Sequence, residues 1–345
     1  MDMSGPLVVI PCLNEERHLA ALLAQLLRDG PSDILIVVAD GGSKDATAEI
    51  ARGFAAEHPQ VRLLSNPKRV QSAAVNLAAL RFGHGRRWMV RVDAHCGYPD
   101  HYVAGLVEAA ERTGAGEVVA PMVTRAEPGE CFQAAVAAAQ NSKLGTGGSA
   151  HRHVGVGQFV DHGHHALFDL AAFMAAGGYD EGFSHNEDAE LDARLTRAGG
   201  KIWIEPSLAL VYHPRKTVGS LFRQYLKYGE GRARNLQRHK AKMKLRQIAP
   251  LAVAPAVGLA IAGVAGLVIV GGWAVLLAVP ALAWAFGACL FGVVLGAKAR
   301  RSCVAFSGPA AMVMHLSWSL GFWRQVLLQR RPGPEPRPFE PSAVI

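Results

Sequence analysis

The sequence lacks the patterns typical of a disulfide scaffold, a zinc finger or a dinucleotide-binding fold. Its five cysteines are odd in number and have no paired spacing, so we expect reduced, mostly buried thiols. No G-x-G-x-x-G follows an apolar run and no G-x-x-x-x-G-K-[ST] is present, which leaves a dinucleotide or P-loop phosphate site unsupported. The N-terminus has no charged leader followed by an apolar core and a cleavage site. We therefore expect no signal peptide and a cytoplasmic location for the first about 245 residues.

Charge is absent from a long C-terminal stretch. Residues 248 to 297 contain no Asp, Glu, Lys or Arg, and this run is about twice the length needed to cross a bilayer once. Because Gly271-Gly272 divides it, we predict two firm spans at about 249–270 and 273–296. A third apolar segment, 304–323, is compatible with a span, a re-entrant segment or an interfacial helix. Basic clusters flanking the two firm spans indicate a multi-pass protein of the inner membrane whose N-terminal part faces the cytoplasm.

Positive charge is concentrated just before these spans. The chain carries a net charge of +8, and the residues from Arg215 to Arg246 include eleven Lys or Arg but one acid, Glu230. Next to a membrane, such a run favours binding to anionic lipid headgroups, so we expect no nucleic-acid partner. We predict a catalytic domain at 1–214, a basic interface region at 215–247, a membrane domain at 248–329 and a disordered proline-rich tail at 330–345.

The N-terminal part alternates short apolar runs with segments of helical period. The runs at 7–11, 34–39, 61–66 and 88–93 are typical of buried strands, and Gly30 and Ser43 are the expected end and start of two intervening helices. This alternation predicts an α/β sheet. In open α/β sheets, ligands bind at the carboxyl ends of the strands. Four polar side chains fall at such ends: Asn14, Glu15, Asp40 and Asp93.

Asp93 and His95 end the strand in "WMVRVDAH". Residues two apart in an extended segment point to the same face, so the carboxylate and the imidazole are aimed together. Such a pair supplies about half of the ligand shell of a divalent cation. The alternative interpretation is a capping aspartate beside an incidental loop histidine.

Six motifs in order carry a resemblance to a known family. They are "VVIPCLNEE", "VADGGSKDAT", "NPKRVQSAAVN", "RVDAH", "GGYDEGFSHNEDAELDARL" and "RQYLKYGEGRAR". Over roughly residues 6 to 240 the chain resembles the family 2 inverting glycosyltransferases with a GT-A fold. Within that family it is most similar to the ExoA-type glycosyltransferases of succinoglycan synthesis. The resemblance implies a GT-A domain, a nucleotide-diphospho-sugar donor, a divalent metal and an acceptor at the membrane face.

The resemblance also implies a donor site. It assigns donor binding to Pro11, Asn14, Glu15, Asp40, Lys68 and Asp93, with Asp40 at the uracil ring. Helix capping is the alternative for Asn14 and Glu15. His95 stands where the family usually has the second Asp of a D-x-D motif, and because imidazole suits Mn²⁺ better than Mg²⁺ we expect a preference for Mn²⁺. His213 is a candidate third metal ligand, with a structural loop histidine as the alternative.

The same resemblance implies the catalytic base. An inverting transfer needs a carboxylate that takes the proton of the acceptor hydroxyl. By similarity to the E-D pair of the family, Asp188 is the base and Glu187 contacts the acceptor. The alternative is that a helix N-terminus merely favours two acids there.

Acceptor contacts are expected in a histidine-rich loop and a basic helix. The residues are His164, His165, Gln224, Lys227 and Tyr228. Many family members have a basic residue near positions 164–165, so this loop departs from their pattern. A zinc site formed with His151, His153 and His162 is disfavoured because no cysteine accompanies them. An apolar stripe around Leu221 predicts that the helix lies in the membrane interface, with docking on the catalytic domain as the alternative.

These features together predict a membrane-anchored enzyme. It transfers a hexose from a UDP-sugar to a polyprenyl-diphosphate-linked saccharide in exopolysaccharide or envelope synthesis. Two alternatives are a processive polysaccharide synthase and a catalytically inactive membrane scaffold with the same fold.

Overall fold

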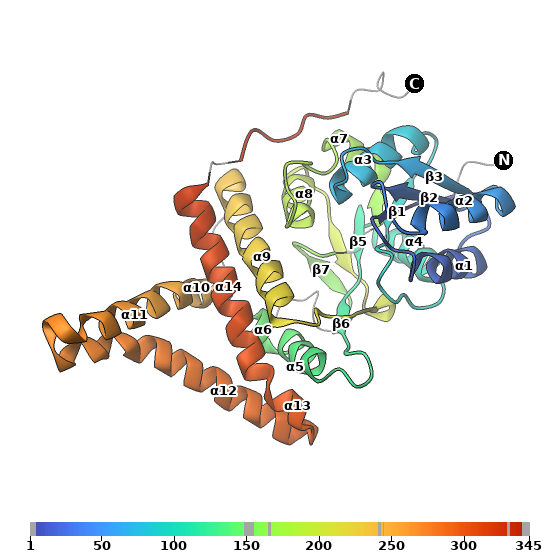
Figure 1. The fold of residues 1–345 in the computed structure, drawn as a ribbon. Coiled ribbons are helices and arrows are strands. Elements are labelled where there is room, and N and C mark those ends of the chain that lie inside the picture. Colours follow the sequence, from blue (N-terminus) through green and yellow to red (C-terminus); the bar gives the residue numbers. More distant parts are fainter. Residues whose placement is uncertain are drawn as a thin grey trace. The chain divides into compact units, whose positions relative to one another are not determined.

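The computed structural model describes residues 5–147, 155–164, 167–240, 243, 245–329 and 332–339 (Figure 1). The chain divides into two compact units, one of residues 1–123, 153–212 and 334–345 and the other of residues 124–152 and 213–333. The boundary predicted at residue 214 is close to one of these divisions, but residues 124–152 also belong to the second unit. The reason is packing, because Val136 of α5 (Cys131–Gln140) shares a buried cluster with Tyr225 and Met314.

The first unit is built on an eight-stranded sheet of order β3-β2-β1-β4-β8-β5-β9-β7. The strands β3, β2, β1 and β4 run parallel, whereas β8 is antiparallel to both β4 and β5. A separate two-stranded sheet has the order β10-β6. The bounds are β1 (Leu7–Cys12), β2 (Leu35–Asp40), β3 (Val61–Ser65), β4 (Trp88–Arg91), β5 (Glu117–Val119), β6 (Met122–Thr124), β7 (Gln158–Val160), β8 (Leu167–Asp169), β9 (Ile202–Ile204) and β10 (Leu210–Tyr212).

Helices follow the strands as the sequence predicts, with one correction. α1 ends at Gly30, whose N–H donates to the carbonyl of Leu26. The predicted cap at Ser43 is wrong, because α2 begins at Thr47 and the Ser43 hydroxyl donates to Asp40 instead. The helices of this unit are α1 (Leu19–Asp29), α2 (Thr47–Glu57), α3 (Gln71–Phe82), α4 (Tyr102–Thr113), α7 (Leu170–Ala175) and α8 (Glu187–Arg197), with a 3₁₀ turn, η2 (Pro206–Leu208).

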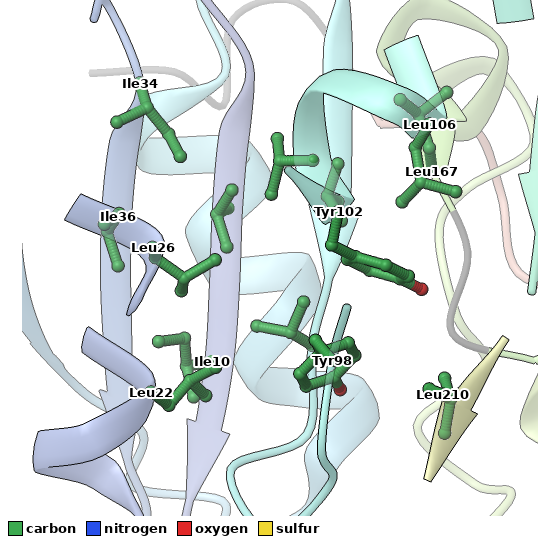
Figure 2. Close-up of a cluster of buried hydrophobic side chains, with 14 of the residues drawn as sticks. Ile10, Leu22, Leu26, Ile34, Ile36, Tyr98, Tyr102, Leu106, Leu167 and Leu210 are labelled. Atoms are coloured by element: carbon green, nitrogen blue, oxygen red, sulfur yellow. The ribbon is translucent and has the colours of Figure 1, made fainter. Parts of the chain in front are cut away.

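Buried side chains on β1 and β2 fix the position of the strand ends. Figure 2 shows Leu22 and Leu26 of α1 against Ile10 and Ile36, all of them nearly or fully buried. Tyr98, which follows β4, extends the same cluster. Since an interior this closely packed tolerates little displacement, the loops that leave the carboxyl ends of β1, β2 and β4 start from fixed positions.

The second unit is helical. Its elements are α5 (Cys131–Gln140), α6 (Lys143–Thr146), α9 (Val218–His239), α10 (Leu245–Leu251), α11 (Val253–Val270), η3 (Gly272–Ala278), α12 (Val279–Ala299), α13 (Ser302–Ala305) and α14 (Ser307–Leu328). α9 packs along α14, and a Cβ added at Gly229 or Gly321 would overlap the backbone of the facing helix. Glycine at both positions therefore allows the two helices to approach closely.

Three helices are long and apolar enough to cross a membrane, judged by length and composition. They cover 247–267, 272–299 and 302–328. The first two correspond to the predicted firm spans. The third includes the segment 304–323, which the sequence left between a span and an interfacial helix, and it meets the same criterion.

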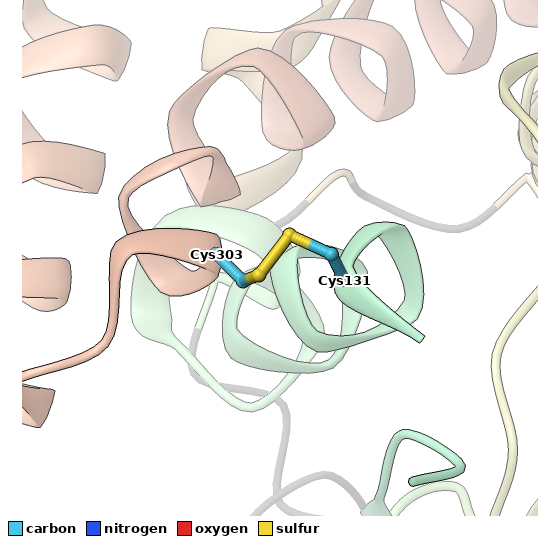
Figure 3. Close-up of a disulfide and its surroundings, with 2 residues drawn as sticks. All are labelled: Cys131 and Cys303. Atoms are coloured by element: carbon cyan, nitrogen blue, oxygen red, sulfur yellow. A yellow bond between two sulfur atoms is a disulfide. The ribbon is translucent and has the colours of Figure 1, made fainter. Parts of the chain in front are cut away.

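Two further features of the chain differ from the sequence prediction. Cys131 and Cys303, 172 residues apart, form a disulfide between α5 and α13 (Figure 3), so the prediction of five unpaired thiols is wrong. No local spacing signals this pair, because the packing of the second unit brings the two helices together. Part of the tail predicted to be disordered has defined contacts, since Arg197 pairs with Glu335 at 2.8 Å and the N–H of Phe339 donates to the carbonyl of Met174.

Candidate active site

The loops after β1 and β2 are tied together by polar side chains. Asn14 has a φ of 59°, its Oδ1 accepts from the N–H of Lys44 at 2.8 Å, and its own N–H donates to Ser43 Oγ at 2.9 Å. The carboxylate of Asp40 accepts from the N–H groups of Gly42 and Ser43, both at 3.1 Å. Since α1 starts at Leu19 without a side-chain cap, helix capping does not explain Asn14. Pro11 is paired in register with Ala39 on the adjacent strand.

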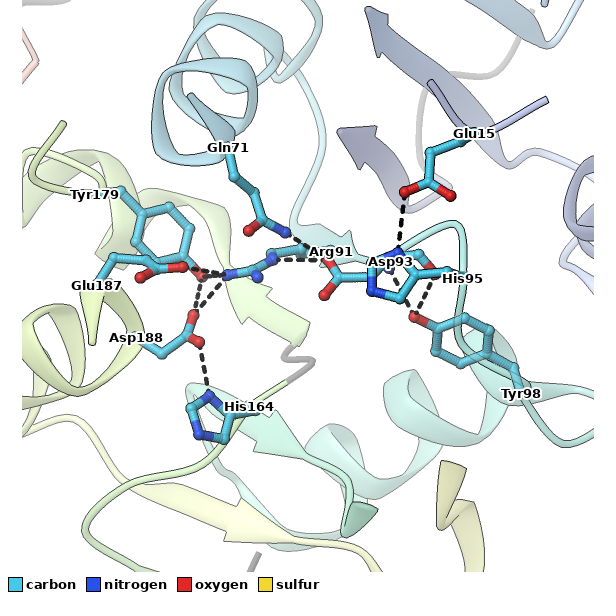
Figure 4. A network of polar contacts seen from close by, with 10 residues as sticks. All are labelled: Glu15, Gln71, Arg91, Asp93, His95, Tyr98, His164, Tyr179, Glu187 and Asp188. Carbon is cyan, nitrogen blue, oxygen red and sulfur yellow. Dashed lines mark hydrogen bonds and ion pairs between the residues drawn. The ribbon is translucent and has the colours of Figure 1, made fainter. Parts of the chain in front are cut away.

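A second group of side chains gathers beyond β4. Nδ1 of His95 lies 3.0 Å from Oε1 of Glu15, and Gln71 Nε2 donates to Oδ1 of Asp93 at 2.6 Å (Figure 4). Possible ligand atoms of Asp93, His95 and Cys96 all lie within 4.8 Å of one another. The structure thus brings Asp93 and His95 together, as the sequence predicts, and places Glu15 against the imidazole.

The donor types of this group suit a hard or borderline divalent cation. Carboxylate oxygen and imidazole nitrogen are ligands for Mn²⁺. The Cys96 thiol is a poorer ligand here, because burial, reinforced by the charge of Asp93, raises its pKa and keeps it neutral. Glu15 lies against Nδ1 of His95. In many metal sites a carboxylate in this position orients the imidazole ligand. His213 belongs to the second unit and is not a member of this group, so its role as a ligand stays a prediction.

Arg91, which the sequence analysis did not single out, connects this group to the acids of α8. Its side chain is buried, and its Nε lies 3.3 Å from Asp93 Oδ1 while its Nη1 lies 2.7 Å from Asp188 Oδ1. Nη1 is also 3.8 Å from Glu187 Oε1. The Tyr179 hydroxyl donates to the same Asp188 oxygen at 2.8 Å (Figure 4). An arginine inside a buried strand was the available signal, because a charged side chain is rarely buried without a partner.

The pKa values of the two acids at the start of α8, Glu187 and Asp188, are shifted in opposite directions. Burial tends to raise the pKa of Asp188, but Arg91, His164 and Tyr179 outweigh burial and hold that pKa well below its ordinary value. Burial and the charge of Asp188 raise the pKa of Glu187 to about 8, against the opposing effect of Arg91. At neutral pH Asp188 is therefore the anion and Glu187 carries a proton.

The loop between β7 and β8 supplies two histidines that face α8. Nδ1 of His164 lies 2.7 Å from Asp188 Oδ2, and Nδ1 of His162 lies 2.7 Å from Asp192 Oδ2. The two rings meet edge to face with centroids 4.7 Å apart. Behind them, burial and the charge of Asp192 raise the pKa of Glu117. Among the described residues these histidines pair with acids and form no part of a metal group; His151, His153 and His165 lie outside the described residues.

The remaining predicted site residues have other partners. Lys68 is exposed and pairs with Glu181 at 2.5 Å. In the second unit, Gln224 donates to the Tyr228 hydroxyl at 3.0 Å along α9, and Lys227 is exposed. Their predicted roles toward donor or acceptor stay predictions.

Comparisons with known proteins agree with this architecture. A family model described as glycosyl transferase family 2 matches residues 7–174. The chain is 52% identical over 336 residues to succinoglycan biosynthesis protein ExoA of Rhizobium meliloti, which covers 96% of this chain and 98% of that protein.

Two further similarities are more distant, one in sequence and one in fold. A dolichyl N-acetyl-alpha-D-glucosaminyl phosphate 3-beta-D-2,3-diacetamido-2,3-dideoxy-beta-D-glucuronosyltransferase of Methanococcus voltae is 23% identical over 236 residues, covering 64% of this chain and 71% of that one. A mannosyltransferase of Pyrobaculum calidifontis, solved with GDP-Man and Mn²⁺, aligns with a TM-score of 0.53 at 18% identity over 93% of this chain and 87% of that one.

Proposed function

Because the chain belongs to glycosyltransferase family 2, as a relative of succinoglycan biosynthesis protein ExoA, we propose that it transfers a hexose with inversion from a UDP-sugar to a polyprenyl-diphosphate-linked saccharide in succinoglycan-type exopolysaccharide synthesis. The observation that carries the proposal is the joining of two groups of side chains by Arg91 at the carboxyl ends of β1, β2 and β4. One group, around Asp93, suits a donor diphosphate and its metal. The other, around Asp188, suits an acceptor hydroxyl.

The donor is proposed to bind at the loops after β1 and β2. Asp40 and Asn14 hold these loops in a fixed conformation, so the backbone beside a uracil ring is ordered before the nucleotide arrives. Pro11, Glu15 and Lys68 complete the proposed donor contacts. The family relationship supports this placement of the nucleotide.

Asp93 and His95 are proposed to hold a divalent ion, with Mn²⁺ preferred over Mg²⁺ because of the imidazole. When bound, such an ion stabilises negative charge on the leaving diphosphate. The protein side chains orient the site: Gln71 and Arg91 fix the Asp93 carboxylate, and Glu15 fixes the His95 ring. The mannosyltransferase solved with GDP-Man and Mn²⁺ supports the proposal by its fold alone.

Deprotonation of the acceptor is proposed to depend on Asp188, with Glu187 beside it as an acceptor contact. Glu187 carries a proton at neutral pH and can donate a hydrogen bond to a sugar oxygen. The apolar helices α11, α12 and α14 are proposed to anchor the chain in the inner membrane with the catalytic unit facing the cytoplasm. We also propose that His164, Gln224, Lys227 and Tyr228 contact the acceptor or the anionic lipid surface; His165, predicted for the same role, lies outside the described residues.

The experiment uses membranes containing the full-length chain or Asp188→Asn. Each is incubated with radiolabelled UDP-glucose, UDP-galactose or their N-acetyl forms, with Mn²⁺ or with EDTA, and label in organic-extractable lipid is counted. We expect label from one donor, only with Mn²⁺ and intact Asp188. Label from none of the four donors would refute the proposed reaction, and full transfer by Asp188→Asn would remove this carboxylate from the mechanism.

A further inference from the structure

The segment that follows the last apolar helix returns to the first unit. Residues 334–339, which we call the C-terminal strap, belong to that unit although the helices before them belong to the second. Glu335 pairs with Arg197 of α8 at 2.8 Å, and the N–H of Phe339 donates to the carbonyl of Met174 in α7 at 3.2 Å. The strap therefore contacts both α7 and α8, the helices on either side of the turn that leads to the catalytic acids.

Two consecutive glycines after α7 leave space that the strap fills. Gly177 and Gly178 have φ values of 82° and 64°. A Cβ at position 177 would overlap the carbonyl oxygen of Arg337, and a Cβ at position 178 would lie 2.7 Å from the ring of Phe339. Glycine is the residue whose backbone has the greatest conformational freedom. The strap thus packs on the two positions of the turn that are least restrained by their own side chains.

The next residue of the turn, Tyr179, connects these glycines to Asp188. Its N–H donates to Oδ1 of Asn76 and its carbonyl accepts from Nδ2 of Asn76, both at 2.9 Å. Its ring is buried, and its hydroxyl donates to Oδ1 of Asp188 at 2.8 Å (Figure 4). The place of the hydroxyl therefore depends on the backbone at Gly178, which Phe339 covers from the other side.

We propose that the C-terminal strap holds Tyr179 on Asp188 and that Phe339 is a positioning residue for the transfer. This inference rests on the proposed function, because it concerns a reaction that depends on Asp188. Without the Phe339 ring the backbone at Gly178 gains freedom, and the carboxylate loses the firm hold of one of the two donors to its Oδ1. A shift of about 1 Å at a reacting group can cost about 10²-fold in rate, so a small movement of the turn is enough.

The test is a double-mutant cycle of Phe339→Ala and Tyr179→Phe in the full-length chain. It uses the membrane assay with the UDP-sugar, among the four, that labels lipid with the wild type. Tyr179→Phe removes the hydroxyl but keeps the buried ring, and we expect it to lower kcat about 10-fold, the effect of one hydrogen bond to a charged group. Phe339→Ala should also lower kcat, but no further than Tyr179→Phe does. In the Tyr179→Phe background the same change should cost less than about twofold, because the hydroxyl through which the strap acts is already gone.

The matched control is Arg337→Ala. It shortens an exposed side chain of the strap and keeps the backbone carbonyl that lies against Gly177, so we expect wild-type kcat. Thermal unfolding shows whether each variant is folded at the assay temperature. If Phe339→Ala is not, Phe339→Val, which removes the ring but keeps part of the apolar contact, replaces it in the cycle.

Either of two results would overturn the inference while leaving the glycosyl transfer intact. One is a folded Phe339 variant with wild-type kcat. The other is a cycle in which the two losses multiply, because a strap that only stabilises the fold acts independently of the Tyr179 hydroxyl. Failure of the wild type with all four donors refutes the proposed function instead.

Discussion

Removal of the Arg91 guanidinium should destabilise the first unit far more than removal of a surface arginine. Arg91→Met leaves Asp188, Asp93 and Glu187 buried or half-buried around an uncharged side chain, because the guanidinium is the cation between them. Breaking a buried ion pair by removing one partner costs about 3–5 kcal/mol. For a unit of about 200 residues, each kcal/mol lowers Tm by about 2–4 °C, so we expect a decrease of about 6–20 °C.

The assay is thermal unfolding of the purified full-length chain in detergent, followed by tryptophan fluorescence. The matched control is Arg112→Met, which removes an equally close ion pair, 2.6 Å from Glu205, on a side chain that is 54% exposed. An exposed pair contributes at most about 1 kcal/mol, so the control should lose less than about 4 °C. Equal decreases in the two variants would refute the argument that burial makes the Arg91 contacts strong.

The effect should also depend on pH in a stated direction. In the wild type the pKa of Asp188 is depressed, so its contribution to stability is complete above the pKa of an unfolded aspartate, about 4, and is lost below it. Without Arg91 the folded-state pKa of Asp188 rises, so more of this carboxyl is protonated as the pH falls and part of the cost is relieved. The gap between Arg91→Met and the wild type is therefore expected to be smaller at pH 5 than at pH 8. A gap that widens toward pH 5 would contradict this account.

Three further predictions concern charge, metal and packing. The pKa of Glu187 is raised to about 8, so its contribution to wild-type stability should fall as pH rises from about 4.5 to 8. Glu117, whose pKa is also raised, gives a slope of the same sign, so Glu187→Gln should make the fall in unfolding temperature less steep without removing it; an unchanged slope would count against the raised pKa of Glu187. Asp93→Ala should weaken Mn²⁺ binding measured by electron paramagnetic resonance. EDTA should abolish transfer, and Mn²⁺ should restore it better than Mg²⁺. Full activity in EDTA would exclude a metal from the mechanism. Gly321→Ala should lower Tm, because the added Cβ would overlap the Leu226 carbonyl. The control Gly258→Ala, at an open position of α11, should raise Tm or leave it unchanged. Equal changes in Tm would contradict the close approach of α9 and α14.

The strand-end part of the site could be predicted from the sequence because its geometry is local. Asp40, Asp93 and His95 follow apolar runs, and parallel strands of one sheet bring their carboxyl ends to one edge. No knowledge of long-range packing is needed for that step. Even there, the pairing of Glu15 with His95 across 80 residues depends on the loop after β1 turning toward the loop after β4.

The surroundings of Asp188 could not be predicted in the same way. His164 and Tyr179 reach it from a loop and a turn on either side of β8, which is inserted antiparallel between β4 and β5. Nothing in the spacing of residues 164, 179 and 188 encodes that insertion. The Cys131–Cys303 disulfide is a second case, since it depends on helix packing in the second unit rather than on a cysteine motif.

The choice of arginine at position 91 follows from the distances in the site. One guanidinium places Nε 3.3 Å from Asp93 and Nη1 2.7 Å from Asp188, so two different nitrogens serve two carboxylates. A lysine ammonium is a compact charge on a flexible stem, and a single nitrogen would have to serve both acids at once. The planar fork thus fixes the separation between Asp93, which we assign to the metal site, and Asp188, on which the proposed deprotonation of the acceptor depends. Arg91→Lys would keep the charge but not that separation, so an intact site requires the shape of the side chain as well as its charge.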